Sequence, residues 1–447
     1  MLKRRQFLTA AATIGTGVLI LPRIRLFGAE APSNQLNLAV VGCGGQGRGD
    51  MGGLLSEKGV NLVALCDPDP AQIQKARADA AGRGGDRAKG YEDYRRLLDD
   101  AATFDAVLIA TPDHWHAPLS KAFMQAGKHV YCEKPLTHSV AEAREIREVA
   151  RSSKVVTQMG NQGSASASLR RCVEVIRAGA LGQIREIHQW GICGYAHEGN
   201  APGEDPVPAG FNWDLWVGPS APRPFNKVYH PANWRGWYDF GNGGLADFWC
   251  HASNLPLRAL NLGYPRQLVV NIDDAGSQPP NKPAVEFHFP ARGELAPLTI
   301  FWQGCSLPPE ALLAPVVDVH KEKDGGVLLV GEKGCIHTSH WNTDALIRLE
   351  GEPRLKDILN HPATKDIPES LPRVGSHGRE WVDACRGVGR TYSDFDIGGK
   401  LTEIGLAGVA ALRARKNLDW DGEKMEATNA PEAARFIRPE HRQKWLV

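Results

Sequence analysis

A glycine-rich turn near the start of the chain constrains the fold more than any other feature. The residues Gly42-Cys43-Gly44-Gly45-Gln46-Gly47 fit the pattern G-x-G-x-x-G, directly follow the apolar segment Leu36–Val41 and open a helical segment. In a strand–turn–helix unit such glycines permit a tight turn, a close approach of the backbone to a ligand, and close packing of helix on strand. The free N–H groups and the dipole at the helix start attract phosphate. We therefore predict a dinucleotide site formed by Gly42, Gly44, Gly45, Gln46 and Gly47, with a purely structural turn as the alternative.

An acidic residue follows at the spacing expected of such a site. Asp67 ends a second apolar segment, Leu62–Cys66, 20 residues beyond Gly47. A carboxylate at this position accepts hydrogen bonds from the ribose hydroxyls and repels a 2′-phosphate. No arginine follows Asp67 directly, so NAD is favoured over NADP as the cofactor.

Short apolar strands alternate with helices over residues 36–160. This alternation predicts a parallel, doubly wound α/β sheet, a Rossmann dinucleotide-binding domain. The predicted strands are Leu36–Val41, Leu62–Cys66, Ala106–Ala110, Val130–Cys132 and Val155–Gln158, and the predicted helices are Pro70–Ala80, Tyr91–Leu98, one from about Ala117, and Val140–Arg151.

The pattern changes around Gly160, and residues 161–447 predict a second, α+β domain with a mostly antiparallel sheet. A long Gly/Pro/Trp-rich stretch, 191–243, interrupts it, and no internal repeat is present. The predicted strands are Ile184–Trp190, Gln267–Ile272, Ala284–Phe289, Leu298–Trp302 and Gly326–Val330, and the predicted helices are Leu169–Arg177, Gly378–Ala384 and Gly398–Arg415.

Residues 1–31 have the features of a targeting segment. Arg4-Arg5-Gln6-Phe7-Leu8 resembles the twin-arginine signal, an apolar stretch follows, and Ala29-Glu30-Ala31 fits a cleavage site. The apolar stretch is shorter than the ~20 residues that a membrane span needs. We expect export by the twin-arginine route to the periplasm or another extracytoplasmic space and no membrane span after signal removal, with an uncleaved anchor as the alternative.

The charge of the chain argues against nucleic acid as a partner, and its cysteines argue against a disulfide framework or a metal site. Without residues 1–31 the chain has 47 basic and 50 acidic residues, so no basic excess attracts nucleic acid. The nine cysteines are odd in number and include no C-x-x-C pair, as in a chain that folds without disulfide oxidation. Since no metal-ligand spacing occurs either, no metal site is predicted.

Three further segments carry residues suited to catalysis. Glu133-Lys134-Pro135 and Thr111-Pro112-Asp113-His114-Trp115-His116 each follow a predicted strand, at the sheet edge where ligands bind in such folds. Asp247 and His251 stand at i and i+4 of a predicted helix that opens at Gly243, and hence on one face.

Together these motifs resemble the Gfo/Idh/MocA oxidoreductase family over nearly all of the chain after residue 31. The resemblance implies a C-terminal domain with an open-faced sheet that often supports homo-oligomer contacts, and a substrate lying between the nicotinamide and that sheet. It implies catalytic roles for Lys134, which contacts the reacting hydroxyl or carbonyl, and for Asp247 and the acid/base His251. Further cofactor contacts are expected from residues at the edge of the first sheet, namely Thr111, Pro112, His116, Glu133 and Lys134.

The chemistry of these side chains agrees with that implication. Removing hydride from an alcohol carbon requires a base for the O–H proton, and the ordinary pKa of histidine, ~6.5, suits both directions. Asp247 could orient the His251 ring, and the ammonium of Lys134 can polarise the substrate oxygen. The alternatives are a surface lysine, a helix-surface Asp/His pair, and packing roles for His114 and His116.

Candidates for the substrate side are polar or aromatic. Asn161 and Gln162 follow a predicted sheet strand, and Arg235 precedes the Asp247 helix, so these three join Lys134, Asp247 and His251 as predicted substrate contacts. Six of the 12 tryptophans lie between Trp190 and Trp249, either as faces for sugar rings or as a structural loop packed on the sheet.

The predicted function is NAD-dependent hydride transfer to or from a carbon of a sugar, glycoside or polyol. An exported enzyme has no nicotinamide pool to exchange with, so we expect a tightly held cofactor that is regenerated in place. One alternative is a redox-neutral NAD-dependent glycosidase or lyase that oxidises, eliminates, hydrates and reduces. A non-catalytic sugar sensor or scaffold is the alternative from another class.

Overall fold

The computed structural model describes residues 35–191, 197, 199–271, 283–304, 306–314 and 325–445. The predicted signal, residues 1–31, lies outside these ranges, as does Ile272 at the end of one predicted strand. Residues 36–447 form one unit. No helix in the described ranges has the length and apolarity to cross a membrane.

The first sheet contains six parallel strands in the order β3-β2-β1-β4-β5-β6, the doubly wound Rossmann order that the alternating pattern predicted. Its central strands are apolar on both faces because helices cover both sides, as β1 shows with five of six residues buried. The strands are β1 Leu36–Val41, β2 Val60–Cys66, β3 Lys89–Tyr91, β4 Ala106–Ile109, β5 His129–Glu133 and β6 Thr157–Gly160, and the helices are α2 Gly45–Leu55, α3 Pro70–Asp79, α4 Tyr94–Asp99, α5 Asp113–Gln125 and α6 Val140–Ser153.

Two local predictions in this domain need correction. Residues predicted as one helix, Tyr91–Leu98, divide into the end of β3 and the short helix α4, because Asp93 caps a new helix start at the N–H of Arg95. Helix α5 begins at Asp113 rather than near Ala117, so Asp113 to His116 lie in its first turn.

The second sheet contains ten strands in the order β14-β13-β12-β11-β7-β10-β9-β8-β15-β16. Every neighbouring pair is antiparallel except β7 with β10, which confirms the predicted mostly antiparallel sheet. The strands are β7 Ile184–Trp190, β8 Gln267–Asn271, β9 Ala284–Phe289, β10 Leu298–Trp302, β11 Gly326–Gly331, β12 Gly334–Thr338, β13 Leu346–Leu349, β14 Lys356–Asp357, β15 Leu418–Asp421 and β16 Glu426–Ala427.

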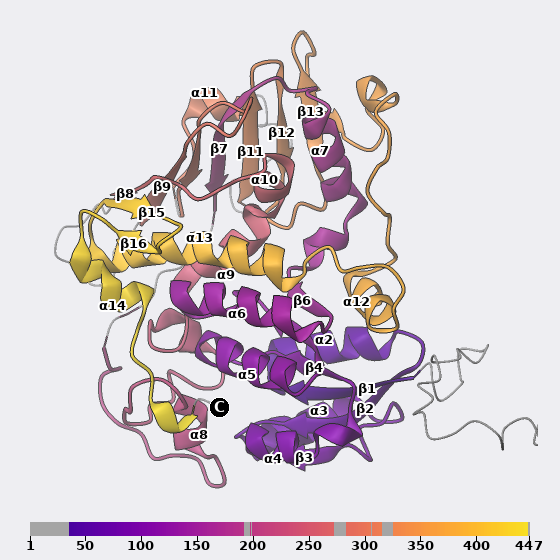
Figure 1. The fold of residues 1–447 in the computed structure, drawn as a ribbon, viewed down its shortest axis with the longest axis vertical. Helices are drawn as coiled ribbons and strands as arrows, with labels where there is room; N and C mark the ends of the chain where they lie inside the picture. The colour runs from indigo at the N-terminus through magenta and orange to yellow at the C-terminus, as the bar shows by residue number, and fades with distance from the viewer. Residues whose placement is uncertain are drawn as a thin grey trace, which may run out of the picture. The chain divides into compact units, whose positions relative to one another are not determined.

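Helices α9 and α13 of the second half lie between the two sheets, and α13 reaches the first domain (Figure 1). The long helix α13 packs on α6 as well as on α9, and α12 packs on α2. The helices are α7 Ala167–Arg177, α8 Trp213–Val217, α9 Gly243–Ala252, α10 Asn254–Ala259, α11 Glu310–Leu313, α12 His377–Cys385, α13 Phe395–Ala414 and α14 Ala434–Ile437.

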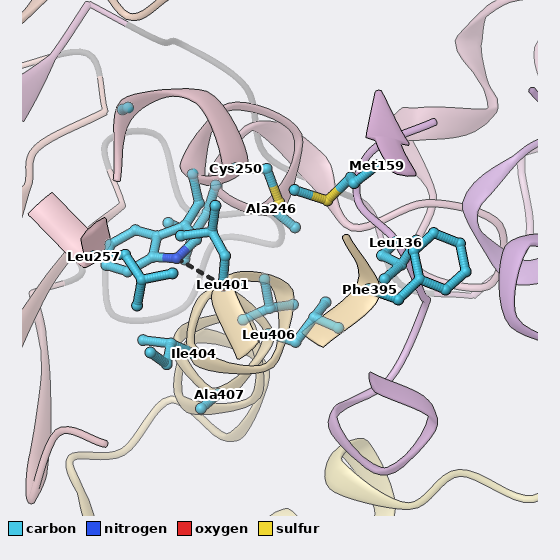
Figure 2. Close-up of a cluster of buried hydrophobic side chains, with 14 of the residues drawn as sticks. Leu136, Met159, Ala246, Cys250, Leu257, Phe395, Leu401, Ile404, Leu406 and Ala407 are labelled. Carbon is cyan, nitrogen blue, oxygen red and sulfur yellow. Dashed lines mark hydrogen bonds between the residues drawn. The ribbon is translucent and has the colours of Figure 1, made fainter. Parts of the chain in front are cut away.

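A buried apolar cluster fixes α9, the helix that carries Asp247 and His251. Figure 2 shows Ala246 and Cys250 of α9 above Leu401 of α13. Trp249 adds a hydrogen bond, since its indole Nε1 donates to the carbonyl of Leu401 at 2.9 Å. This packing leaves little freedom to rotate α9, so the catalytic candidates on it are held in place.

Candidate active site

The glycine turn has the geometry that a pyrophosphate requires. Gly42 has a φ of +88°, and a Cβ on it would lie 2.5 Å from the carbonyl oxygen of Ala110; a Cβ on Gly47 would lie 2.0 Å from that of Gly42. By contrast, a Cβ on Gly44 or Gly45 would meet nothing within 4 Å. Gly44, the N-cap of α2, has no side chain to accept from the first N–H groups, and Gly44, Gly45 and Gln46 line a pocket, so these N–H groups fit a phosphate.

Asp67 lies beside this turn as predicted. One carboxylate oxygen accepts from the N–H of Cys43 at 2.8 Å and the other from that of Asp69 at 2.9 Å. Burial raises the pKa of Asp67 to about 7, although these two backbone hydrogen bonds lower it. Asp67 lines one pocket together with Gly42, Gly44, Gly45 and Gln46 of the turn and with Thr111 and Pro112.

The Trp-rich stretch covers this cofactor pocket. Its aromatic side chains pack on one another, which favours the structural-loop interpretation. The stretch is tied to the first domain because the N–H of Asn212 donates to the carbonyl of Pro68 at 3.1 Å and His230 pairs with Asp69 at 2.9 Å. Five of its residues line the pocket: Leu215, Trp216, His230, Pro231 and Trp234.

The two histidines of α5 are buried and hydrogen-bonded to backbone. The ring nitrogens of His116 lie 2.7 Å from the carbonyl oxygen of Pro135 and 2.8 Å from that of Thr111, so this ring links the ends of β5 and β4. Burial lowers the pKa of His116 to about 4 and that of His114 to about 3. A direct cofactor contact by His116 stays a prediction.

The predicted catalytic residues from separate segments converge on one charged cluster. Lys134, directly after β5, forms an ion pair with Asp247 of α9, and both side chains are mostly buried. Arg235, in the 3₁₀ turn η4 (Asn233–Gly236), lies 3.3 Å from Asp247 and 3.0 Å from Asp113. The cluster therefore contains two cations and two carboxylates.

Asp113 is a member of this cluster that sequence reasoning missed as a site residue. Its side chain is fully buried, and Asn242 donates to it through its backbone N–H at 3.2 Å and its side-chain amide at 3.3 Å. Burial raises the pKa of Asp113 to about 6, although the nearby Arg235 guanidinium lowers it. Asp113 lies in the segment Thr111–His116, but the sequence of that segment does not indicate that Arg235 is its partner.

His251 lies beside the cluster with both ring nitrogens unoccupied. It is 2% exposed, and neither nitrogen has a hydrogen-bond partner among the described residues. Burial, together with the positive charge of Lys134, holds the pKa of His251 well below its ordinary value, so the ring is neutral. The neutral ring is open to a substrate O–H, but its lowered pKa makes it a weaker base than the ordinary histidine expected from the sequence.

The expectation that Asp247 orients His251 is wrong for this structure. The two side chains share α9 at the predicted spacing, but the Asp247 carboxylate binds Lys134 and Arg235 instead. The attraction of two cations outweighs a hydrogen bond to a neutral ring.

Asn161 and Gln162 are both engaged within the protein. Asn161 donates to the carbonyl of Cys250 in α9 at 3.2 Å and accepts from Ser164 and Ser393, so it joins β6 to α9. The amide of Gln162 donates to Glu133 at 2.9 Å. Their predicted substrate contacts stay predictions.

A second missed feature is a pair of carboxyl groups, Asp50 and Glu133. Burial raises the pKa of Asp50 to about 6 and that of Glu133 well above its usual range. Asp50 Oδ2 is buried and has no donor among the described residues, as expected if the two carboxyl groups share a proton. Asp50 follows the glycine turn by one helical turn, a position that sequence patterns do not mark.

The described ranges contain no group of three or more His, Cys, Asp or Glu side chains placed to hold a metal ion.

The chain matches the models of both domains of one protein family. Residues 36–161 match the "Oxidoreductase family, NAD-binding Rossmann fold" of Gfo/Idh/MocA proteins, and residues 170–275 match the "Oxidoreductase family, C-terminal alpha/beta domain". These matches together cover more than half of the 447 residues. The chain thus belongs to the Gfo/Idh/MocA oxidoreductase family, and the cofactor of its Rossmann domain is NAD, as predicted.

The curated relatives of this chain have low sequence identity to it and match only part of its length. A glycosyl hydrolase family 109 protein from Stenotrophomonas maltophilia (strain K279a) is 28% identical over 203 residues, which are 44% of this chain and 43% of the relative. The chain thus spans less than half the length of this curated relative.

Solved structures share the fold over most of both chains. The aldose-aldose oxidoreductase from Caulobacter crescentus, complexed with glycerol, has a TM-score of 0.57 at 17% identity and covers 86% of this chain and 99% of its own. An inositol dehydrogenase homologue from Azotobacter vinelandii, complexed with NADH and myo-inositol, has a TM-score of 0.59 at 19% identity, covering 86% and 98%.

Proposed function

We propose that this protein is an NAD-dependent oxidoreductase that moves a hydride to or from a hydroxyl-bearing carbon of an uncharged sugar, glycoside or polyol. The observation that carries the proposal is the position of His251, neutral and without a hydrogen-bond partner, beside the ion pair of Lys134 with Asp247. A sensor or scaffold would have no use for a buried proton acceptor next to a buried ammonium.

The protein's own residues divide the proton chemistry between them. His251 accepts the proton of the substrate O–H at one ring nitrogen as the carbon is oxidised, and returns it when a carbonyl is reduced. The Lys134 ammonium donates a hydrogen bond to the same oxygen and stabilises the negative charge that develops there. Asp247 holds Lys134 in position through their ion pair. Bound NAD supplies the hydride acceptor, and its reduced form the donor.

The charges of the cluster favour an uncharged substrate. The cations Lys134 and Arg235 are matched by the carboxylates Asp113 and Asp247. Within this cluster no cation is left over for a phosphate or a uronic acid, whereas a substrate hydroxyl can accept from Lys134 and donate to Asp247. Among the structural neighbours, the names aldose-aldose oxidoreductase and inositol dehydrogenase homologue support this substrate class, whereas the WlbA dehydrogenase from Chromobacterium violaceum is complexed with the charged UDP-GlcNAcA, so the proposal of an uncharged substrate rests on the charges of the cluster.

We further propose that the protein is exported by the twin-arginine route with its cofactor tightly held, and that it forms a homo-oligomer. The Arg4-Arg5 segment supports the export, and the cover of the pocket by Leu215, Trp216 and Trp234 supports retention of NAD. In such an enzyme one sugar is oxidised and a second is reduced by the same bound cofactor.

A redox-neutral glycosidase is the second candidate, and the relatives favour it. Curated relatives at 28–30% identity carry the name glycosyl hydrolase family 109. In this reaction a transient oxidation acidifies a neighbouring C–H, the glycosidic bond is eliminated, water adds, and the ketone is reduced again. The same Lys134 and His251 would serve its first and last steps.

One experiment separates the two candidates. Purified NAD-loaded protein is incubated with aldoses, inositols and p-nitrophenyl glycosides while absorbance is followed at 340 nm and at the nitrophenolate band. The oxidoreductase forms NADH that a second sugar reoxidises, without release of nitrophenolate. The glycosidase releases nitrophenolate without net NADH. If neither signal appears although the protein contains NAD, both proposals are overturned.

A further inference from the structure

Trp341 is an exposed tryptophan beside the catalytic candidates His251 and Lys134. Its side chain is 44% exposed, whereas the other eleven tryptophans are buried or half-buried. It lies after β12, far from the Trp-rich stretch in sequence. Leaving a large aromatic surface in water is unfavourable, so an exposed indole at an active site suggests a ligand.

The backbone around Trp341 is held rigidly. The neighbouring Asn342 is fully buried in a left-handed conformation with φ 58°; its amide donates to the carbonyls of Ser339 and His340, and its side-chain oxygen accepts from the N–H of Leu255 at 3.2 Å. On the other side, a Cβ on Gly163 would lie 1.9 Å from the Trp341 carbonyl oxygen, so the two backbones touch.

The indole lies next to the groups that move the proton. Its ring centroid is 4.2 Å from that of His251 and 6.2 Å from that of Phe248. Phe248 in turn lies 6.2 Å from His251 and has the Lys134 ammonium 6.0 Å from its ring centre. Two aromatic rings thus adjoin both members of the predicted acid/base machinery.

We propose that Trp341, together with Phe248, is a platform on which the C–H face of a cyclic sugar or polyol stacks. The axial hydrogens of a six-membered ring form a weakly positive, apolar patch that matches the negative face of an indole. Stacking on Trp341 brings a ring hydroxyl to His251 and Lys134. An acyclic polyol presents no such flat face, so the platform selects cyclic substrates. This inference rests on the proposed function and adds the shape of its substrate.

Binding measurements test the platform independently of turnover. NAD-loaded wild-type, Trp341→Ala and Trp341→Phe proteins are titrated with myo-inositol, methyl β-D-glucopyranoside and the acyclic D-sorbitol, using saturation-transfer NMR. We expect Trp341→Ala to weaken binding of the cyclic compounds about tenfold and Trp341→Phe to retain most of it, since one ring remains. D-Sorbitol binding should change less than about twofold. Leu359→Ala, which removes another exposed apolar side chain (49% exposed), is the matched control and should match wild type.

The results that would overturn the platform differ from those that would overturn the proposed function. The platform is overturned if Trp341→Ala binds the cyclic compounds as well as the wild type does, or if it loses D-sorbitol binding to the same extent. It is also overturned if the wild type binds neither cyclic compound. A change from oligomer to monomer in Trp341→Ala, measured by sedimentation, also overturns it, because Trp341 would then be a subunit contact. If the cyclic compounds bind as expected but none is turned over, the proposed function fails and the platform stands.

Discussion

Lys134 and Asp247 form a mostly buried ion pair although 113 residues separate them in the chain. Lys134 follows strand β5 of the first sheet, and Asp247 lies on a helix that precedes most strands of the second. The pair therefore joins the NAD-binding Rossmann half to the C-terminal half beside His251. The proposed hydride transfer depends on this junction.

Replacement of His251 should abolish proton transfer without loss of cofactor. We expect His251→Ala to lower kcat by about 10²- to 10⁴-fold, the usual contribution of a positioned acid/base, with NAD content unchanged. Lys134→Ala should also lower kcat, because the substrate oxygen loses its charged donor. His288→Ala, on strand β9 with a partly exposed ring, is the control. Full activity of His251→Ala on any sugar would remove His251 from the mechanism.

The glycine turn offers a pair of matched variants. Gly44 has ordinary backbone angles, φ −76° and ψ −162°, and space for a Cβ, so Gly44→Ala should fold with an unchanged Tm. The added methyl group takes the space of the phosphates, so we expect NAD affinity to fall at least about tenfold. Gly49→Ala, in the same helix and equally unobstructed, should keep NAD and gain about 0.5–1 kcal/mol of stability. Calorimetry and NAD content after gel filtration measure both effects, and normal NAD binding by Gly44→Ala would contradict the placement.

Asp67 should make NAD binding depend on pH. Its pKa is raised to about 7 by burial, so the carboxyl is mainly protonated at pH 6 and ionised at pH 8. Only the ionised form accepts from both ribose hydroxyls with full strength, so NAD affinity should rise several-fold between these pH values. Asp67→Asn should remove this dependence and reduce the discrimination against NADP. Fluorescence titration at pH 6, 7 and 8 measures the NAD affinity of wild type and Asp67→Asn. If the affinity rises equally with pH in both proteins, another group causes the pH dependence.

Local sequence patterns predicted the parts of the site whose neighbours are close in the chain. The glycine turn, the carboxylate of Asp67 and the i, i+4 spacing of Asp247 and His251 each follow from one strand–turn–helix unit or one helix. Apolar runs and alternation likewise predicted the central strands of both sheets. Strands β3 and β12 to β16 were missed. Strands β3 and β13 to β16 have only two to four residues, which give no clear period, and the five residues of β12 include only two adjacent apolar side chains, Cys335 and Ile336.

Features that depend on distant partners could not be predicted. Asp113 meets Arg235 across 122 residues, and Asp50 meets Glu133 through the packing of α2 on the sheet. Trp341 lies in a turn whose sequence gives no sign that His251 is its neighbour. For the Trp-rich stretch, composition left two interpretations open, and only the fold placed it over the cofactor pocket rather than beside His251.

The C-terminal segment should control the retention of NAD. Trp445 is 4% exposed, packs edge-on against Trp115 and accepts a hydrogen bond from the hydroxyl of Tyr94; both partners line the cofactor pocket. Trp445→Ala leaves a cavity there and should destabilise the protein by about 3 kcal/mol. We expect faster loss of NAD on dialysis, with Glu440→Ala, at an exposed position of the same segment, as the control. A destabilised variant that still retains its full NAD would show that this segment has no part in retention.

The buried carboxyl of Asp113 makes a prediction about stability and pH. Its pKa of about 6 lies above the ordinary 3.8, so between these values the folded protein holds a proton that the unfolded chain has lost. Its contribution to stability therefore falls as the pH rises through this window. Arg235→Met removes the main compensating charge and should raise the Asp113 pKa further, so that more stability is lost at pH 8 than at pH 5.

The loss in Arg235→Met should be about 2 kcal/mol at pH 8, below the ~3–5 kcal/mol of a fully buried pair, because Arg235 is partly exposed. At pH 5 Asp113 is mainly protonated in the folded state and the loss should be small. The double variant Arg235→Met/Asp113→Asn, which keeps only the Lys134–Asp247 pair charged at this point, should recover most of the stability at pH 8. Arg96→Met breaks an exposed pair with Asp99 and should change stability little at either pH. Urea unfolding at both pH values measures the three variants and the wild type. An equal loss for Arg235→Met at pH 5 and pH 8 would show that Arg235 acts through packing or through Asp247, and not through the charge of Asp113.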